Sequence, residues 1–218
     1  MRYVFEHLGV AVFAIAGVLA ATNKRVDLFG VLVLALVTAL GGGTLRDLIL
    51  GIPPFWTVDV SFIFGAAAAA GITFFAARSW DVSSTSLLIA DACGLALFTM
   101  IGTERAIAFS ASNTVAVVLG VMTGVAGGMM RDVLTGEIPL VLRPGIYLYA
   151  TAALCGAVAF VLTAPHMSPP ASQSIAVAVT LALRLAAIRW RLRLPEFQGG
   201  GTAAITPKTP APSHPRDT

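Results

Sequence analysis

Two copies of one sequence motif, 85 residues apart (132 − 47), constrain this chain more than any other feature. The copies are GGGTLRD at 41–47 followed by Gly51 and Pro54, and GGMMRD at 127–132 followed by Gly136 and Pro139. Each copy places helix-breaking glycines and an adjacent Arg-Asp pair at the end of a long apolar run. Any fold for this chain must accommodate the same costly feature twice.

The composition indicates an integral membrane protein. Of 218 residues, 57% are hydrophobic and only 11% are charged, and the mean hydropathy is +0.86. A soluble domain carries about 25% charged residues. The formal net charge of +3 is too small to indicate a nucleic-acid partner. We interpret the basic residues as a topology signal instead.

A membrane-spanning helix needs about 20 mostly apolar residues. Seven runs come near that length: 4–22, 26–45, 58–77, 87–103, 114–130, 146–163 and 175–193. The segment 196–218 follows them and is rich in proline, threonine and glycine, a composition that predicts a disordered tail.

The 85-residue offset covers more than the motif, because it also aligns Glu6 with Asp91 and Phe13 with Phe98. It divides the chain into a first repeat at 1–80 and a second at 86–165. Each repeat holds three spans, an odd number, so the second must enter the membrane from the opposite side. The sequence therefore predicts an all-α membrane protein with seven transmembrane helices, arranged as two inverted three-helix repeats plus a C-terminal helix at 175–193.

The basic residues that flank the spans predict the orientation. On one side lie Lys24, Arg25, Arg78, Arg143, Arg189, Arg191 and Arg193, and on the other lie Arg2 and Arg105. Basic residues are in excess on the cytoplasmic side. We therefore expect the N-terminus outside the cell and the C-terminus in the cytoplasm.

The glycine clusters Gly41–Gly43 and Gly127–Gly128 have two interpretations. Small residues let helix backbones approach closely, but consecutive glycines supply more flexibility than packing requires, at about 1 kcal/mol each against alanine. We therefore favour a kink or an unwound turn, whose carbonyl groups must be buried in protein or line a watery cavity. Facing a cavity, they could replace part of a cation's hydration shell.

The pairs Arg46-Asp47 and Arg131-Asp132 place charge within or beside a span, where ionisable groups usually face the bundle interior or a pathway. The alternative is an interfacial pair that anchors the end of a helix. A neighbouring arginine keeps the aspartate ionised, and a neutralised pair need not repel a permeating cation.

Glu6 and Asp91, at equivalent starts of the first and fourth spans, either cap their helices or form an acidic pathway mouth. Arg184, in the middle of the last span, should face a partner helix, although the sequence does not identify its counter-ion.

Nothing in the sequence favours catalysis, a metal or a cofactor. Cys93 and Cys155 lie in apolar runs without metal-ligand spacing. An intramembrane aspartyl dyad of Asp47 and Asp132 is disfavoured, because each has an adjacent arginine and inverted topology places them toward opposite membrane faces. We therefore expect that the chain is not an enzyme.

The paired motifs, GGGTLRD with GIPPFW at 51–56 and GGMMRD with GEIP at 136–139, resemble those of a prokaryotic member of the trimeric intracellular cation (TRIC) channel family. The resemblance covers residues 1–193 and implies a homotrimer in the plasma (inner) membrane. It further implies an ion pathway inside each protomer, kinked at the glycine clusters. The site residues that it carries over are Gly41, Gly42, Gly43, Arg46 and Asp47, with Gly127, Gly128, Arg131 and Asp132.

The leading hypothesis is a monovalent-cation channel for potassium or sodium. Because the broad bacterial family is also described as glycine transporters, a secondary carrier of glycine or another small zwitterion is the alternative. A purely structural membrane subunit would instead be dry and fully packed at the glycines. Animal TRIC channels, associated with phosphoinositide, have a lysine-glutamate pair where this chain has Arg-Asp. Membrane lipid remains an expected partner, with Arg131 a possible contact for an anionic head group.

Overall fold

The structure, a computed structural model, describes residues 2–22, 24, 26–77, 83–143 and 148–190. These ranges contain eight α-helices. Their bounds are α1 (Arg2–Ala21), α2 (Leu28–Ile49), α3 (Phe55–Val58), α4 (Ser61–Ala76), α5 (Ser84–Ala108), α6 (Asn113–Leu134), α7 (Ala150–Thr163) and α8 (Pro169–Trp190). The predicted tail at 196–218 lies outside the described residues, as do Arg25, Arg78, Arg191 and Arg193.

The predicted fold class is confirmed. Helices α1, α2, α5, α6 and α8 are long and apolar enough to cross a membrane, and α4 and α7, the third helices of the two repeats, are shorter apolar helices. Some details differ from the prediction, among them the end of α6, which continues past residue 130 to Leu134 and includes Arg131 and Asp132. The four-residue helix α3 was not expected, and α2 continues past residue 45 to Ile49, so that Arg46 and Asp47 lie inside the helix rather than after it.

The two repeats begin and end their second helices at equivalent positions. Helices α2 and α6 both have 22 residues, and each follows a capping side chain, Asp27 for α2 and Ser112 for α6. Asp27 accepts a hydrogen bond from the Gly30 amide at 2.8 Å, and Ser112 accepts one from the Val115 amide at 3.4 Å. Such caps satisfy amide groups that have no partner within the helix. The local signals that start these helices are therefore duplicated along with the apolar pattern.

Contacts between the repeats are reciprocal, as a two-fold axis requires. The rings of Phe13 on α1 and Phe98 on α5 stack with centroids 5.2 Å apart and planes 12° apart. Gly9 lies against the Phe98 ring, and Gly94 lies against the Phe13 ring. The 85-residue offset relates Gly9 to Gly94 and Phe13 to Phe98, so these two contacts are equivalent under the two-fold axis. The axis therefore passes between the two phenylalanines.

The same axis passes between α2 and α6, which cross at their glycines. A Cβ atom on Gly42 would collide with the carbonyl oxygen of Thr123, and one on Gly127 would collide with the carbonyl oxygen of Thr38. Both helices are continuous through these positions, so the predicted unwound turn is wrong, whereas the predicted kink stays a prediction. The glycines instead let the two backbones touch, which small residues permit at helix crossings.

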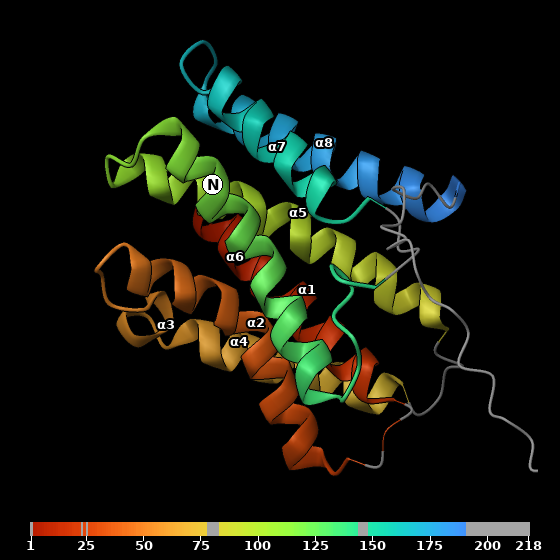
Figure 1. Cartoon of the computed structure of the whole chain (residues 1–218). Coiled ribbons are helices and arrows are strands. Elements are labelled where there is room, and N and C mark those ends of the chain that lie inside the picture. The colour runs from red at the N-terminus through yellow and green to blue at the C-terminus, as the bar shows by residue number, and fades with distance from the viewer. Residues whose placement is uncertain (1, 23, 25, 78–82, 144–147, 191–218) are drawn as a thin grey trace, which may run out of the picture.

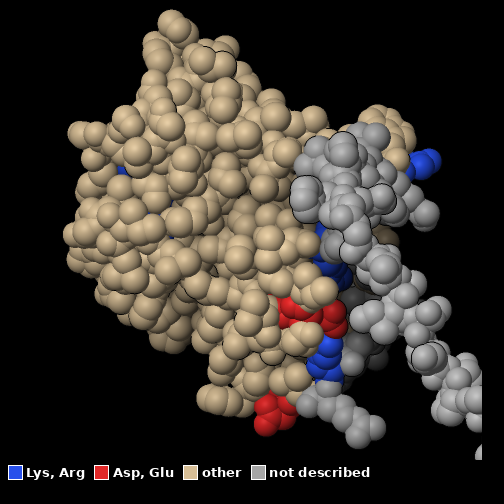
Figure 2. All heavy atoms as spheres, in the orientation of Figure 1, with Lys and Arg blue, Asp and Glu red and all other residues tan. Residues whose placement is uncertain are grey.

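The remaining helices surround this centre. Helix α4 packs against α1 and α2, and α7 packs against α5 and α6. Helix α8 lies beside α7 along one edge of the bundle and contacts α5 (Figure 1). The face shown in Figure 2 is almost free of Lys, Arg, Asp and Glu, and those that it carries gather on one side. An uncharged face of this kind suits contact with lipid.

Candidate functional site

The first motif copy joins the end of α2 to the loop that follows it. The Nε and Nη2 atoms of Arg46 each lie 2.8 Å from Oδ1 of Asp47, and the backbone amide of Phe55 donates to Oδ2 at 2.8 Å. The chain reverses at Gly51, whose φ of +70° favours glycine. The spacing of the motif thus lets one carboxylate hold both its neighbouring arginine and the loop.

The second copy repeats this geometry at the end of α6. Nε and Nη2 of Arg131 lie 2.8 Å from Oδ1 of Asp132, and the Leu140 amide donates to Oδ2 at 2.8 Å. The turn occurs at Gly136, with a φ of +71°. Asp47, Arg131 and Asp132 are all at least 97% buried. Both ion pairs are therefore buried in the protein near the ends of their helices, where each aspartate also holds the loop that follows. Their depth in the membrane, within a span or at its interface, stays a prediction.

Other charged side chains extend the first pair into a cluster. Nη1 of Arg105 on α5 donates to Oε1 of Glu6 on α1 at 3.0 Å, and its Nε lies 3.6 Å from Oδ1 of Asp47. We call Glu6, Arg46, Asp47 and Arg105 the first charge cluster. It contains two acids and two arginines, so its charges balance.

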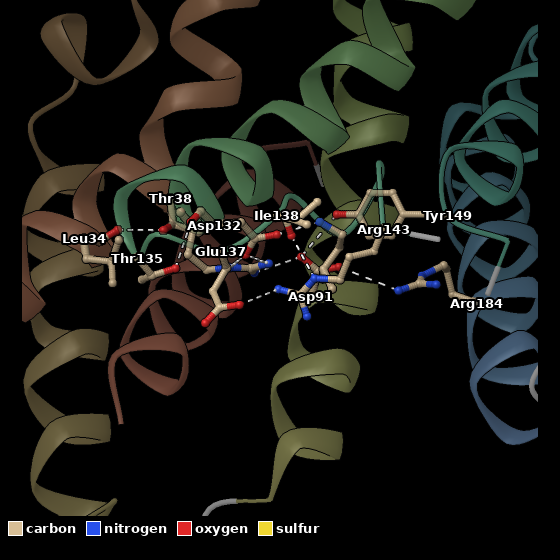
Figure 3. Close-up of polar contacts among 12 residues, drawn as sticks. Leu34, Thr38, Asp91, Asp132, Thr135, Glu137, Ile138, Arg143, Tyr149 and Arg184 are labelled. Carbon is tan, nitrogen blue, oxygen red and sulfur yellow. Dashed lines mark hydrogen bonds and ion pairs between the residues drawn. The ribbon is translucent and has the colours of Figure 1, made fainter. Parts of the chain in front are cut away.

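A second charge cluster surrounds the second pair and comprises Asp91, Arg131, Asp132, Tyr149 and Arg184. Asp91, Asp132, Tyr149 and Arg184 are labelled in Figure 3. Oδ1 of Asp91 accepts from Nη1 of Arg131 at 2.9 Å and from the Tyr149 hydroxyl at 3.2 Å. Nη2 of Arg184, on α8, lies 3.9 Å from Oδ2 of Asp91, and its guanidinium carbon lies 4.6 Å from the centroid of the Tyr149 ring. Two acids again balance two arginines.

Helix α5 reaches both clusters, because Asp91 belongs to the second and Arg105 to the first. At a rise of 1.5 Å per residue, these two positions lie about 21 Å apart along the helix. The two clusters therefore occupy opposite ends of the bundle.

Several predictions about charged residues can now be compared with the geometry. Each aspartate of the motif does neutralise its adjacent arginine, and Arg184 does face other helices, with Asp91 as a counter-ion. The placement of Asp91 at a helix start is wrong, because α5 begins at Ser84 and Asp91 is fully buried within it. Glu6 is also buried, at 7% exposure. Their role along a pathway stays a prediction.

The sequence did not identify Arg105 or Tyr149 as cluster members. The position of Arg105 in the sequence indicates only a basic residue that flanks a span on the outer side. Tyr149 lies just before α7, where an aromatic residue gives no signal of its own.

The other glycines of the two motifs make room for side chains. Gly41 lies under the sulfur of Met130, and Gly43 lies under the Phe55 ring. A Cβ atom on Gly128 would lie 3.0 Å from both Oδ1 of Asp91 and the Tyr149 hydroxyl. Gly128 thus leaves space for the second charge cluster.

A groove of about 350 Å³ opens beside Gly41. Its lining is Leu36, Val37, Leu40, Gly41, Thr44, Leu45, Trp56 and Met130. The only polar side-chain atoms there are engaged with each other, because Trp56 Nε1 donates to the Thr44 hydroxyl, which donates to the Leu40 carbonyl. This groove is therefore apolar and suits an acyl chain better than a cation.

An anionic lipid head group at Arg131 is ruled out in this conformation. Arg131 has no exposed surface and is held by Asp132 and Asp91. Two accessible basic groups at that end of the bundle, Lys24 and Arg143, contact Glu137 at 2.6 and 3.3 Å. The hydrogen bond from Lys24, with the charges of Lys24 and Arg143, lowers the pKa of Glu137.

The sequence matches a known protein family and several related membrane proteins. A family model described as "Glycine transporter" matches residues 3–78 and 88–165, one match for each repeat. A UPF0126 membrane protein of Vibrio cholerae is 43% identical over 205 residues, which cover 90% of this chain and 83% of the relative. The UPF0126 inner membrane protein YadS of Escherichia coli K12 is 44% identical over 199 residues, covering 89% and 95%.

Solved structures share the fold. The TRIC trimeric intracellular cation channel orthologue from Rhodobacter sphaeroides is 37% identical, with a TM-score of 0.82 over 88% of this chain and 98% of that one. A structure from work on conductance through TRIC cation channels is 34% identical, with a TM-score of 0.79 over 91% and 98%. The resemblance predicted from the paired motifs is confirmed, and the solved structures that share the fold are cation channels rather than enzymes.

Proposed function

Because the chain belongs to the glycine transporter (UPF0126) family of inner-membrane proteins and shares the fold of prokaryotic TRIC cation channels, we propose that it is a monovalent-cation channel. The observation that carries this proposal is the match to TRIC structures at 29–37% identity over nearly the whole chain. In the proposal, three copies assemble and each conducts potassium or sodium through its own pathway. The name of the Rhodobacter relative, a trimeric channel, supports the homotrimer.

The charge clusters support a pathway that runs from one to the other. An isolated buried arginine would repel a cation, whereas Arg46 and Arg131 are each matched by a carboxylate at 2.8 Å. Balanced clusters at both ends of α5 lower this electrostatic barrier, and their carboxylate oxygens are ligands that hard cations accept. The pathway would be lined by α1, α2, α5 and α6.

The structure would then represent a closed conformation. Helices α2 and α6 touch at Gly42 and Gly127, which leaves no room for an ion between their backbones at that level. Conduction requires the two helices to separate or bend there. In this proposal the glycines are hinges as well as packing residues, and Gly41, Gly43 and Gly128 contribute the same flexibility.

A planar-bilayer recording tests the channel directly. Purified wild-type protein between unequal potassium chloride solutions should give currents that reverse near the potassium equilibrium potential. A matched preparation without the protein is the control. Reversal near the chloride potential, or no current at any voltage, would contradict the proposal.

The description of the family model favours a second candidate, a secondary carrier of glycine. Inverted repeats are also common in carriers. Liposomes loaded with unlabelled glycine should then take up labelled glycine faster than empty ones, with saturation. A channel predicts no stimulation by internal glycine, so this assay separates the two candidates.

We also propose that the N-terminus lies outside the cytoplasm and the C-terminus within it. With Cys93 and Cys155 replaced by serine, Val58→Cys and Glu137→Cys would place single thiols on exposed residues that follow the two motifs, one at the end of α3 and one after α6. In intact spheroplasts, a membrane-impermeant maleimide should label Val58→Cys, whereas Glu137→Cys should require permeabilised membranes. The reverse pattern would invert the orientation.

A further inference from the structure

The two charge clusters hold their second arginines, Arg105 and Arg184, in different ways. In the first cluster, Arg105 donates a hydrogen bond of 3.0 Å to Glu6. In the second, Nη2 of Arg184 stays 3.9 Å from Oδ2 of Asp91, beyond hydrogen-bonding distance. That oxygen is fully buried and accepts no hydrogen bond from the described part of the chain. The sister oxygen Oδ1, in contrast, accepts two.

A buried carboxylate oxygen without a hydrogen-bond donor is unusual enough to need an explanation. Asp91 has no exposed surface, and Arg184, whose Nη2 lies 3.9 Å from this oxygen, is also fully buried. Arg184 rests on the face of the Tyr149 ring, where a guanidinium is attracted to the π system. Figure 3 shows it extending from α8 toward Asp91.

We propose that Oδ2 of Asp91 is a binding site for a monovalent cation and that Arg184 is a tethered cation that takes the place of this ion in the closed conformation. The inference deepens the proposed channel function, on which it rests, by naming a site and its regulation. A permeating ion must displace the Arg184 guanidinium from Asp91 to occupy the site. Movement of α8 therefore controls access to it.

The positions of the helices make Arg184 the movable partner. Arg131 is fixed by Asp132 and Asp91 at 2.8 and 2.9 Å and belongs to α6 at the centre of the bundle. Helix α8 lies outside both repeats and, within the described ranges, packs only against α5 and α7. It can shift without disturbing the contact between α2 and α6.

Potassium flux into liposomes tests the tether, with Arg184→Gln as the first variant. Loss of the tethered charge should raise flux about tenfold, because a buried cation–π contact with an ion pair contributes roughly the energy that corresponds to one decade. Arg189→Gln, an exposed arginine on the same helix, is the matched control and should leave flux unchanged. Tyr149→Leu removes the ring that holds Arg184 without changing the charge, so it should also raise flux, by several-fold.

A measurement without flux separates this inference from the channel proposal. Potassium chloride, compared with choline chloride, should raise the melting temperature of purified Arg184→Gln more than that of wild type, because the ion fills the vacated site. Adding Asp91→Asn should abolish this difference. If wild type carries no current, the channel proposal fails, but the potassium effect still decides the site.

The inference is overturned if neither Arg184→Gln nor Tyr149→Leu raises flux and potassium has no selective effect on stability. Arg184→Gln could also lower the stability of the protein, and adding Asp91→Asn could restore it, while neither flux nor the response to potassium changes. That result would make Arg184 only a counter-ion for a buried acid. If Arg184→Gln does not fold, Tyr149→Leu alone decides, since its charges remain balanced.

Discussion

An Asp132→Asn variant should lose about 3–5 kcal/mol of folding free energy, because removal of one partner of a buried ion pair leaves the other charge uncompensated. Arg131 would remain buried with only Asp91 as a close acid. Asparagine also offers one oxygen where Asp132 uses two, for Arg131 and for the Leu140 amide. The helix end and its loop would therefore lose their common anchor. Thermal denaturation in detergent, followed by the fraction of protein that stays monodisperse, measures the loss.

Glu137→Gln is the matched control for this prediction. It removes the same charge five residues later, but the Glu137 side chain is 46% exposed and its pairs with Lys24 and Arg143 lie at the surface. Exposed pairs contribute about 0–1 kcal/mol. Equal melting temperatures for Asp132→Asn and Glu137→Gln would contradict the role assigned to the motif aspartate.

Alanine at Gly42 or Gly127 should destabilise the protein by about 1–3 kcal/mol, the range for overpacked cores. The added methyl group meets a backbone carbonyl of the opposite helix, which cannot rotate away as a side chain could. The double variant should cost less than the sum of the two, because the first methyl already separates the helices.

Gly65→Ala supplies the control for these substitutions. Gly65 lies on α4 with no atom within 4 Å of the position of a Cβ. Alanine there should be neutral or stabilising by up to about 1 kcal/mol, because glycine is the poorer helix former. A Gly42→Ala variant as stable as Gly65→Ala would show that α2 and α6 do not touch as described.

Much of the architecture could be predicted from the sequence, because the evidence for it is local or repeated. The 85-residue offset aligned α2 with α6 residue by residue, and adjacency in the chain made the Arg46-Asp47 pair easy to foresee. Phe13 and Phe98 aligned with each other before their rings were found to stack on the axis.

What escaped prediction depends on contacts between distant segments. Arg184 has no counterpart in either repeat, so nothing in the pattern linked it to Asp91, 93 positions earlier (184 − 91). The position of Arg105 suggests a surface charge because its partner Glu6 lies 99 positions earlier in the chain. The glycines suggested an unwound turn because the flexibility of glycine lowers the stability of an isolated helix. Here the contact between α2 and α6 offsets that loss.

The reciprocal contact of Gly42 with Thr123 and of Gly127 with Thr38 is of the kind that joins two subunits of a symmetric dimer, in which each partner presents the same patch. In this protein the two partners are halves of a single polypeptide. Two identical chains related in this way would have to carry the same chemistry at both membrane faces. Fusion removes that requirement, and the halves have diverged, with an arginine from α5 at one end and one from α8 at the other. One fold can thus carry a different set of charged side chains at each of its two ends.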